Sequence, residues 1–454
     1  MDSVAKDESS LLKAAVPSFA MRLACTALDA ALCAARRLAI LSGLKTNTSP
    51  AESPPPPQNP SSLRVMFTSS DNDSTSGAFL CMLELATSLK RHHNIDPIVI
   101  LPCQGSGTAL LAQASIPYLY VPSSDWTLPL SANHRSFSSA RSIVRRHRLN
   151  HTAIRRIASL AQTLAVDISH NNTSWNPTGT LAARKARIPC IWHIRELLEE
   201  GQSRKLWSPS VCCSIFASAN QLVATSKSIE RKDSPLLPPG KITTIYDGCD
   251  VSRFLQPSRT ILQSTPFTFI MVGGICAYKG HTDFAQACAR LYTQGFRSFK
   301  ILFVGNADPQ TKSFLDSTFA AAGMSHLVEY CGRQPHPETF FSRADIAFTC
   351  SIFEAFGRVT VEAMLSGCLL IGRASGATSE LVSHGSTGLL YSPQGDIPGN
   401  LCAQILHAVS HPSLMRTIAA AGRSHMASQM NLQRNVSSIA SLYHSITSTP
   451  SPAN

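Results

Sequence analysis

The chain has few acidic residues: 28 aspartates and glutamates stand against 40 lysines and arginines, which gives a net charge of +12. This balance predicts a negatively charged partner, such as a phosphorylated small molecule, an anionic membrane surface or nucleic acid. The sequence also has no apolar run of the roughly 18–20 residues that a membrane-spanning helix requires. A transmembrane protein is therefore not expected.

Three further patterns are missing. The 14 cysteines form no CxxC pair and no Cys/His cluster at zinc spacing, and most of them lie in apolar runs. Reduced thiols pack there as small hydrophobic groups, so we expect a cytoplasmic protein without a bound metal. No nucleic-acid-binding module is recognisable, which argues against a nucleic acid partner. No GxGxxG follows the first predicted strand, which argues against a nicotinamide-dependent dehydrogenase.

Short apolar strands alternate with segments of helical periodicity through most of the chain, as in LRVMFTSS (63–70) followed by GAFLCMLELATSLKRHH (77–93). This order is typical of parallel sheets that are covered by helices on both faces. A Pro/Gly-rich stretch at 235–254 ends the first series, and FTFIMVGG (267–274) begins a second. We therefore predict an α/β fold with two Rossmann-like, doubly wound domains that face each other across a cleft. The predicted parts are an N-terminal extension (1–45), a Pro/Ser-rich linker (46–62), a first Rossmann-like domain (63–254), an interdomain linker (255–265), a second Rossmann-like domain (266–430) and a C-terminal helix and tail (431–454).

The N-terminal extension is Ala-rich and has an amphipathic pattern that is interrupted by charged residues. An amphipathic helix fits this pattern, either packed on the body or lying on a membrane surface, and so does a disordered segment. The sequence alone leaves these alternatives open.

Two glutamates, Glu354 and Glu362, lie eight positions apart in the otherwise apolar stretch SIFEAFGRVTVEAMLSG (351–367). The first is expected on the loop after a strand, and the second about one turn inside the following helix. Between them lies a helix N-terminus, whose free N–H groups can bind phosphate. Carboxylates only accept hydrogen bonds, so they suit sugar and ribose hydroxyls. This arrangement predicts a nucleotide sugar, although Glu354 as a helix cap and Glu362 as a solvated residue remain the alternative.

The glutamate pair, with Phe356-Gly357 between its members, resembles the signature of the retaining glycosyltransferases of family 4, the "glycosyl transferases group 1" enzymes of GT-B fold. VGGICAYKGH (272–281) and SGATSELVSHGSTGLLY (375–391) are similar to further motifs of this family, and the resemblance covers roughly residues 63–445. It implies a retaining, metal-independent transfer of sugar from a nucleotide-diphosphate sugar to a hydroxyl, without another cofactor. A nucleotide-sugar 2-epimerase and a catalytically weak GT-B binding protein are the alternatives.

The resemblance also implies roles for particular residues. The catalytic candidates are Glu354, His193 and Lys279. The donor-binding candidates are Gly273, Lys279, Glu354, Phe356, Gly357, Arg358, Glu362 and Gly77. Lys279 is expected on the donor diphosphate, and His193 near the donor sugar, with a core histidine as its alternative. Gly274 replaces a basic residue that is usual in the family, so Arg358 or Arg333 would have to supply that contact.

A stretch from Arg135 to Leu164 contains seven arginines and no acidic residue. It fits a helix that rests on anionic lipid headgroups, a site for an acidic acceptor, or a solvated helix face. A lipid-linked or acidic acceptor and peripheral membrane association are therefore all compatible with the sequence.

Overall fold

The structure is a computed structural model that describes residues 62–132, 137–255, 261–263 and 265–448. The predicted N-terminal extension (1–45), all of the linker 46–62 except Ser62, and parts of the interdomain linker (255–265) lie outside the described residues.

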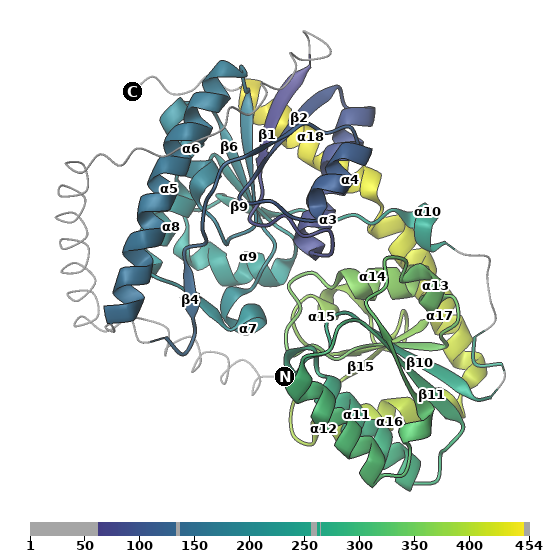
Figure 1. The fold of residues 1–454 in the computed structure, drawn as a ribbon. Helices are drawn as coiled ribbons and strands as arrows, with labels where there is room; N and C mark the ends of the chain where they lie inside the picture. The colour runs from purple at the N-terminus through teal and green to yellow at the C-terminus, as the bar shows by residue number, and fades with distance from the viewer. Residues whose placement is uncertain (1–61, 133–136, 256–260, 264, 449–454) are drawn as a thin grey trace. The chain divides into compact units, whose positions relative to one another are not determined.

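A seven-stranded parallel sheet forms the centre of the first domain, in the order β3-β2-β1-β5-β6-β8-β9 (Figure 1). Its strands are β1 (Leu63–Thr68), β2 (Ile95–Leu101), β3 (Tyr118–Tyr120), β5 (Ile168–Asn172), β6 (Cys190–Ile194), β8 (Gln221–Ala224) and β9 (Ile242–Thr244). The interior strands are short apolar or fully buried runs, such as IDPIVIL in β2. Burial of both strand faces is what a sheet covered by helices on both sides requires.

Helices cover the two faces of this sheet. The helices of this domain are α3 (Gly77–His92), α4 (Gly107–Gln113), α5 (Phe137–Thr163), α6 (Thr178–Ala186), α7 (Leu198–Gln202), α8 (Pro209–Ala217) and α9 (Lys227–Asp233). The short α10 (Val251–Phe254) instead packs on the second domain, where Phe254 is part of the buried core. On one face, α3 packs Phe79, Met82 and Leu85 against the strands. On the other face, α5 packs Ile157 and Ala161 against β1, β2 and α6. The side-chain oxygen of Ser76 caps α3 by accepting a hydrogen bond from the Phe79 N–H.

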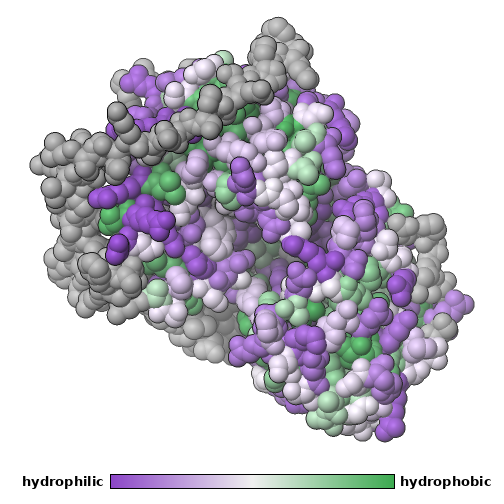
Figure 2. Space-filling view, in the orientation of Figure 1, coloured by the Kyte–Doolittle hydropathy of each residue, from purple (hydrophilic) through white to green (hydrophobic). Residues whose placement is uncertain are grey.

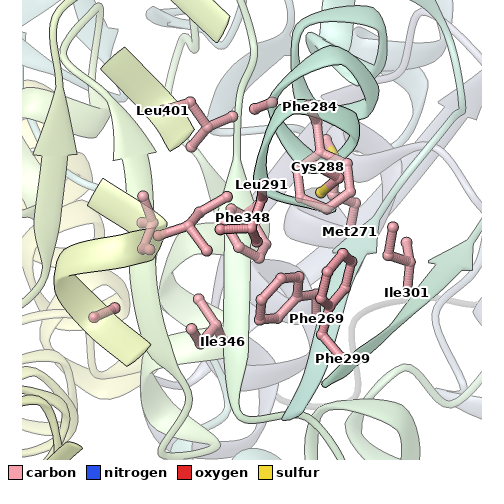
Figure 3. Packing of buried hydrophobic residues seen from close by; sticks show 14 of the residues in the cluster. Phe269, Met271, Phe284, Cys288, Leu291, Phe299, Ile301, Ile346, Phe348 and Leu401 are labelled. Atoms are coloured by element: carbon pink, nitrogen blue, oxygen red, sulfur yellow. The ribbon is translucent and has the colours of Figure 1, made fainter. Parts of the chain in front are cut away.

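The second domain has a six-stranded parallel sheet in the order β12-β11-β10-β13-β14-β15. The strands are β10 (Phe267–Val272), β11 (Phe299–Val304), β12 (Val328–Gly332), β13 (Ile346–Thr349), β14 (Leu369–Arg373) and β15 (Leu389–Tyr391). The helices are α11 (His281–Thr293), α12 (Pro309–Ala321), α13 (Glu338–Phe341), α14 (Arg358–Leu365), α15 (Thr378–Leu381), α16 (Ile397–Ser410) and α17 (Pro412–Gln429). Stacked rings of Phe269 and Phe299 lie between the sheet and α11, where Phe284 meets Phe348 (Figure 3). The prediction of two parallel-sheet α/β domains is confirmed.

Two features were not predicted. An antiparallel pair, β4 (Thr127–Pro129) with β7 (Arg204–Leu206), adds a small second sheet to the first domain. The last helix, α18 (Leu432–Ser448), follows the second domain in sequence but packs into the core of the first, where Val436, Ile439 and Tyr443 are fully buried. One helix therefore contributes to the stability of a domain that is distant from it in sequence.

The visible surface mixes hydrophilic and hydrophobic side chains (Figure 2). Among the described residues, no helix has both the length and the apolar character needed to cross a membrane.

Candidate functional site

A cavity of about 960 Å³ lies at the carboxyl ends of strands from both sheets. Its lining comes from the loops after β1, β5, β6, β10 and β13, and the start of α14. Parallel α/β sheets place ligands at this edge, and the volume is within the range of small-molecule sites. The lining contains six of the predicted residues. Lys279, Glu354, Phe356 and Arg358 contribute side chains, and Gly77 and Gly357 contribute backbone only.

Glu354 lies on the loop between β13 and α14, as predicted. Its Oε1 accepts hydrogen bonds from Lys279 Nζ at 2.6 Å and from Ser351 Oγ at 2.5 Å. Its backbone carbonyl accepts from the Ala377 N–H at 2.9 Å. The glutamate is thus held from both its side chain and its backbone at the cavity wall.

Lys279 ends a single 3-10 turn (Ala277–Lys279) after β10, and Gly280 follows it in a left-handed conformation with φ +74°. A Cβ on Gly280 would lie 2.0 Å from the carbonyl oxygen of Cys350, at the end of β13. Only glycine permits this approach, which brings Lys279 to the loop that carries Glu354. The close approach to Cys350 therefore explains why a glycine must follow Lys279 in this chain.

Gly357 precedes α14 with φ +88°, and the helix begins at Arg358. The first N–H groups of a helix have no intrahelical acceptor, so the start of α14 presents donors and a positive partial charge. Phe356 is buried at 8 % exposure in the core beneath this turn. These residues place the helix N-terminus at the cavity.

Glu362 behaves differently from Glu354. It is 6 % exposed and is not among the residues that line the cavity. Its Oε1 accepts from Arg358 Nε at 2.7 Å, and Arg358 also donates to both carboxylate oxygens of Glu84 on α3, at 2.7 and 2.9 Å. Burial raises the pKa of Glu362, and the Arg358 guanidinium opposes that rise. Arg358 is thus engaged by two carboxylates, one from each domain.

Arg333, the other cation suggested in place of the missing basic residue, does not line the cavity, whereas Arg358 does. Arg333 lies 3.7 Å from Asp73 and is half exposed. Gly274 is exposed, and Gly273, with φ +123°, lies at the end of β10 without lining the cavity. The described structure therefore brings Lys279 and the N-terminus of α14 to this part of the cavity, together with Arg358, which is already bonded to Glu84 and Glu362.

His193 is fully buried and does not line the cavity. Its Nδ1 lies 3.3 Å from His170 Nε2, and His170 Nδ1 lies 2.6 Å from the Tyr443 hydroxyl on α18. Burial holds the pKa of His193 well below its usual value, and the Arg195 guanidinium lowers it further. The structure thus places His193 as an uncharged member of a core network.

Arg195, two residues after His193, does line the cavity. It donates to both carboxylate oxygens of Asp247 and, through Nε, to Asn172 Oδ1 at 2.6 Å. The next residue, Glu196, also lines the cavity, and burial raises the pKa of its carboxyl to about 7. The sequence predicted that either His193 or Arg195 could reach the cleft, because Arg195-Glu196 stands where the family often has a His-Asp pair, and the structure places Arg195 there. Sequence reasoning gave Asp247 no role. The signal for these charged residues was present in the segments RE (195–196) and YDG (246–248), which contain charge at the ends of predicted strands.

Within the described ranges, no group of three or more His, Cys, Asp or Glu side chains is placed to hold a metal ion. The positive charge at the cavity comes from side chains and from the start of α14.

Comparison with known proteins places the chain in a family. Residues 75–253 match the model "Glycosyltransferase Family 4", and residues 253–425 match "Glycosyl transferases group 1". Relatives include N-acetyl-alpha-D-glucosaminyl L-malate synthase of Bacillus anthracis, 25% identical over 50% of this chain and 59% of the relative. Glycogen synthase of Mycobacterium tuberculosis is 26% identical over 50% of this chain and 54% of its own length. The matched region thus spans little more than half of these relatives.

Solved structures agree on the fold. Anabaena HepE, in complex with UDP and glucose, is 20% identical, covers 84% of this chain and 100% of its own, and has a TM-score of 0.68. Sucrose-phosphate synthase of Thermosynechococcus elongatus is 16% identical, with a TM-score of 0.67 over 85% of this chain and 99% of its own. The two family matches meet at residue 253 and together span residues 75–425, which contain every strand of both large sheets except β1. The chain therefore belongs to the group 1 glycosyltransferases and has their GT-B architecture.

Proposed function

We propose that this protein is a retaining glycosyltransferase that moves a sugar from a nucleotide-diphosphate sugar to an acceptor hydroxyl. One observation carries the proposal: Glu354, Lys279 and the N-terminus of α14 meet at one wall of the cavity. A carboxylate for sugar hydroxyls thus lies beside two sources of positive charge for a diphosphate.

The donor binds with its diphosphate at Lys279 and the first N–H groups of α14, and its sugar at Glu354. Binding of its ribose at Glu362, which the family resemblance implies, requires Arg358 to release that carboxylate. HepE is described in complex with UDP-glucose, which supports a nucleotide-sugar donor on this fold. In the ligand-free protein Lys279 bonds to Glu354, and donor binding transfers the lysine to phosphate. Glu354 is then free to accept hydrogen bonds from the sugar.

The transfer needs no nucleophile from the protein. The acceptor oxygen forms a bond to the anomeric carbon on the face from which the diphosphate leaves, while the carbon–oxygen bond to phosphate breaks. The proton of the acceptor hydroxyl passes to a phosphate oxygen of the departing nucleoside diphosphate. Lys279 and the start of α14 stabilise the charge that develops there, so the proposal requires no metal.

The helix α5 shows which arginines of the basic stretch 135–164 are available for contact with a membrane. Arg141, Arg145, Arg148 and Arg155 are exposed and, at spacings of four, three and seven residues, lie along one side of the helix. Hydrophilic side chains gather over this helix in Figure 2. Arg146 is instead paired with Asp125 at 2.8 Å. We propose that the protein is cytoplasmic and rests on anionic lipid headgroups through these four exposed arginines. Co-sedimentation with vesicles of phosphatidylglycerol and of phosphatidylcholine tests this proposal. Equal binding to the two kinds of vesicle would contradict it.

The donor is tested by thermal shift of the purified protein with nucleoside diphosphates and nucleotide sugars. A ligand that binds only the folded state stabilises it by RT ln(1 + [L]/Kd), so the correct base gives the largest shift. Anomeric NMR of the product then compares its configuration with that of the donor. Retained configuration in a glycoside supports the proposal, an isomerised sugar indicates the epimerase alternative, and binding without turnover indicates the binding-protein alternative.

A further inference from the structure

The wall of the cavity that comes from the first domain has an excess of negative charge. The charged residues that line the whole cavity are Asp71, Asp125, Glu196, Asp247, Glu354, Arg195, Lys279 and Arg358. Each of the three cations is already bonded to a carboxylate: Arg195 to Asp247, Lys279 to Glu354, and Arg358 to Glu84 and Glu362. No cation lining the cavity is left to meet an anionic acceptor.

Two of the carboxylates, Asp71 and Glu196, have no cation within ion-pairing distance in the described part of the chain. Asp71 accepts from Ser76 Oγ at 3.0 Å and from the Asp73 N–H at 3.2 Å, and burial raises the pKa of its carboxyl. Glu196 Oε2 accepts from the Ser174 N–H at 2.9 Å and from Ser174 Oγ at 3.0 Å. Its Oε1 is buried and has no hydrogen-bond partner among the described residues. Both residues are partly exposed and line the cavity, and a carboxylate oxygen can accept more than one hydrogen bond, so their accessible oxygens can bind a ligand.

The same wall carries an aromatic ring and several neutral polar groups. Trp175, on the loop after β5, is partly exposed and lines the cavity, and the Arg204 guanidinium lies 5.3 Å from its ring centroid. The β4–β7 sheet supports this region, because Arg204 Nε also donates to Thr127 Oγ1 at 2.9 Å. Neutral polar residues lining the wall are Ser70, Ser76, Ser123, Ser124, Gln202 and Ser203.

We infer that the acceptor is an uncharged, hydroxyl-rich molecule, a sugar or polyol, which lies against Trp175 and donates hydroxyl hydrogen bonds to Asp71 and Glu196. This inference rests on the proposed function and specifies the substrate class of the same cavity. Carboxylates accept hydroxyl protons, and the apolar C–H face of a sugar packs on an indole ring. A phosphorylated or carboxylated acceptor would instead lie beside unpaired acids in a partly water-excluded site, where like charges repel strongly. The net charge of +12 suggested a negatively charged partner, and the basic stretch 135–164 suggested an acidic acceptor, but the excess positive charge does not lie on this wall of the cavity.

A binding experiment tests this inference without turnover. The experiment is saturation-transfer NMR on the full chain in the presence of excess nucleoside diphosphate, chosen as the best ligand of the thermal-shift panel. It would compare the binding of neutral mono- and oligosaccharides and polyols with that of their phosphorylated or uronic acid counterparts. We expect the neutral member of the best pair to bind at least tenfold more tightly. Binding of no neutral compound, or equal or tighter binding of the charged members, overturns the inference.

Variants then locate the contact. Trp175→Ala is expected to raise the acceptor KM, or the acceptor Kd, about tenfold with an unchanged donor KM, and Trp175→Phe to restore most of the affinity. Asp71→Asn should weaken neutral acceptors and reduce the discrimination against anionic ones, whereas Asp73→Asn, in the same loop but outside the lining, should do neither. If the donor binds and is hydrolysed or transferred but these acceptor effects are absent, the acceptor assignment alone fails. If no nucleotide sugar binds, the proposed function fails first.

Discussion

Lys279 Nζ lies 2.6 Å from Glu354 Oε1 in a cavity at the carboxyl ends of both sheets, so the cation proposed for the diphosphate is bonded to the carboxylate proposed for the sugar. The pair is partly exposed, with 36 % and 15 % of the two side chains accessible. Each residue is thereby held in place before a donor arrives. In the proposed mechanism, donor binding exchanges this ion pair for two contacts with the ligand.

Replacing Lys279 with methionine should lower kcat/KM for the donor by about 10²–10³-fold, because the leaving diphosphate loses its nearest side-chain cation. Nucleotide release under steady-state conditions measures the loss. The matched control is Lys312→Met, which removes another lysine–carboxylate pair at 2.6 Å, on the surface of α12. That variant should retain nearly full activity, and a similar loss in both would contradict the assignment.

Glu354→Gln should separate binding from turnover. The substitution releases Lys279 from its ion pair, so the protein should bind nucleoside diphosphate, which has no sugar, more tightly than the unmodified protein does. Turnover of the nucleotide sugar should fall, since the sugar hydroxyls lose a charged acceptor. Thermal shift with the diphosphate and steady-state rates give the two readouts. Weaker diphosphate binding would show that the glutamate supports that site and does not compete for its lysine.

Glu84→Gln should destabilise the protein by about 2 kcal/mol, because it removes the bidentate partner of a largely buried guanidinium. Urea denaturation measures this loss. Glu329→Gln provides a control at an exposed glutamate on β12 and should change stability by less than about 0.5 kcal/mol. An unchanged midpoint for Glu84→Gln would mean that Glu362 alone satisfies Arg358.

Glu196 should make stability depend on pH. Its carboxyl has a folded-state pKa of about 7, above the ordinary value of 4.5, because burial disfavours the charged form. Below pH 4.5 both folded and unfolded states are protonated, and there is no penalty. As the pH rises from 4.5 to 7 the unfolded state ionises first, so stability falls by up to about 3 kcal/mol and then levels off.

Glu196→Gln removes this titration. Denaturation of both proteins at several pH values should show the variant gaining stability relative to the original chain between pH 4.5 and 7, with a constant difference above that range. A difference that is independent of pH would mean that Glu196 ionises at its ordinary pKa in the folded protein.

Much of the fold could be read from the sequence, because apolar runs and helical periodicity are local properties. The run at 267–274 became β10 (Phe267–Val272), and the periodic segment at 77–93 became α3 (Gly77–His92). The short β4 and β7 could not be found in this way. Their paired residues are 75 or more positions apart in the chain. Each strand has only three residues, which is too short to show an alternating pattern. The return of α18 to the first domain likewise depends on long-range packing.

His193 and Arg195 show where a local rule stops applying. Alternation along a strand would put both side chains on one side of the sheet. However, β6 ends at Ile194, so Arg195 lies on the loop beyond it and lines the cavity while His193 remains in the core. The end of a strand is decided by hydrogen bonding to its neighbours, which a single sequence does not specify.

By itself, the sequence determined that the protein has two parallel-sheet domains, and that Glu354 and Lys279 each follow a strand, since residue order and apolar periodicity suffice for this. Only the tertiary structure decided which charges are already paired. Arg358 is bonded to both Glu362 and Glu84, while Asp71 and Glu196 line the cavity without a cation partner among the described residues. Electrostatic pairing acts over a few ångströms between residues that are up to 274 positions apart in the chain, so it appears only once the chain has folded.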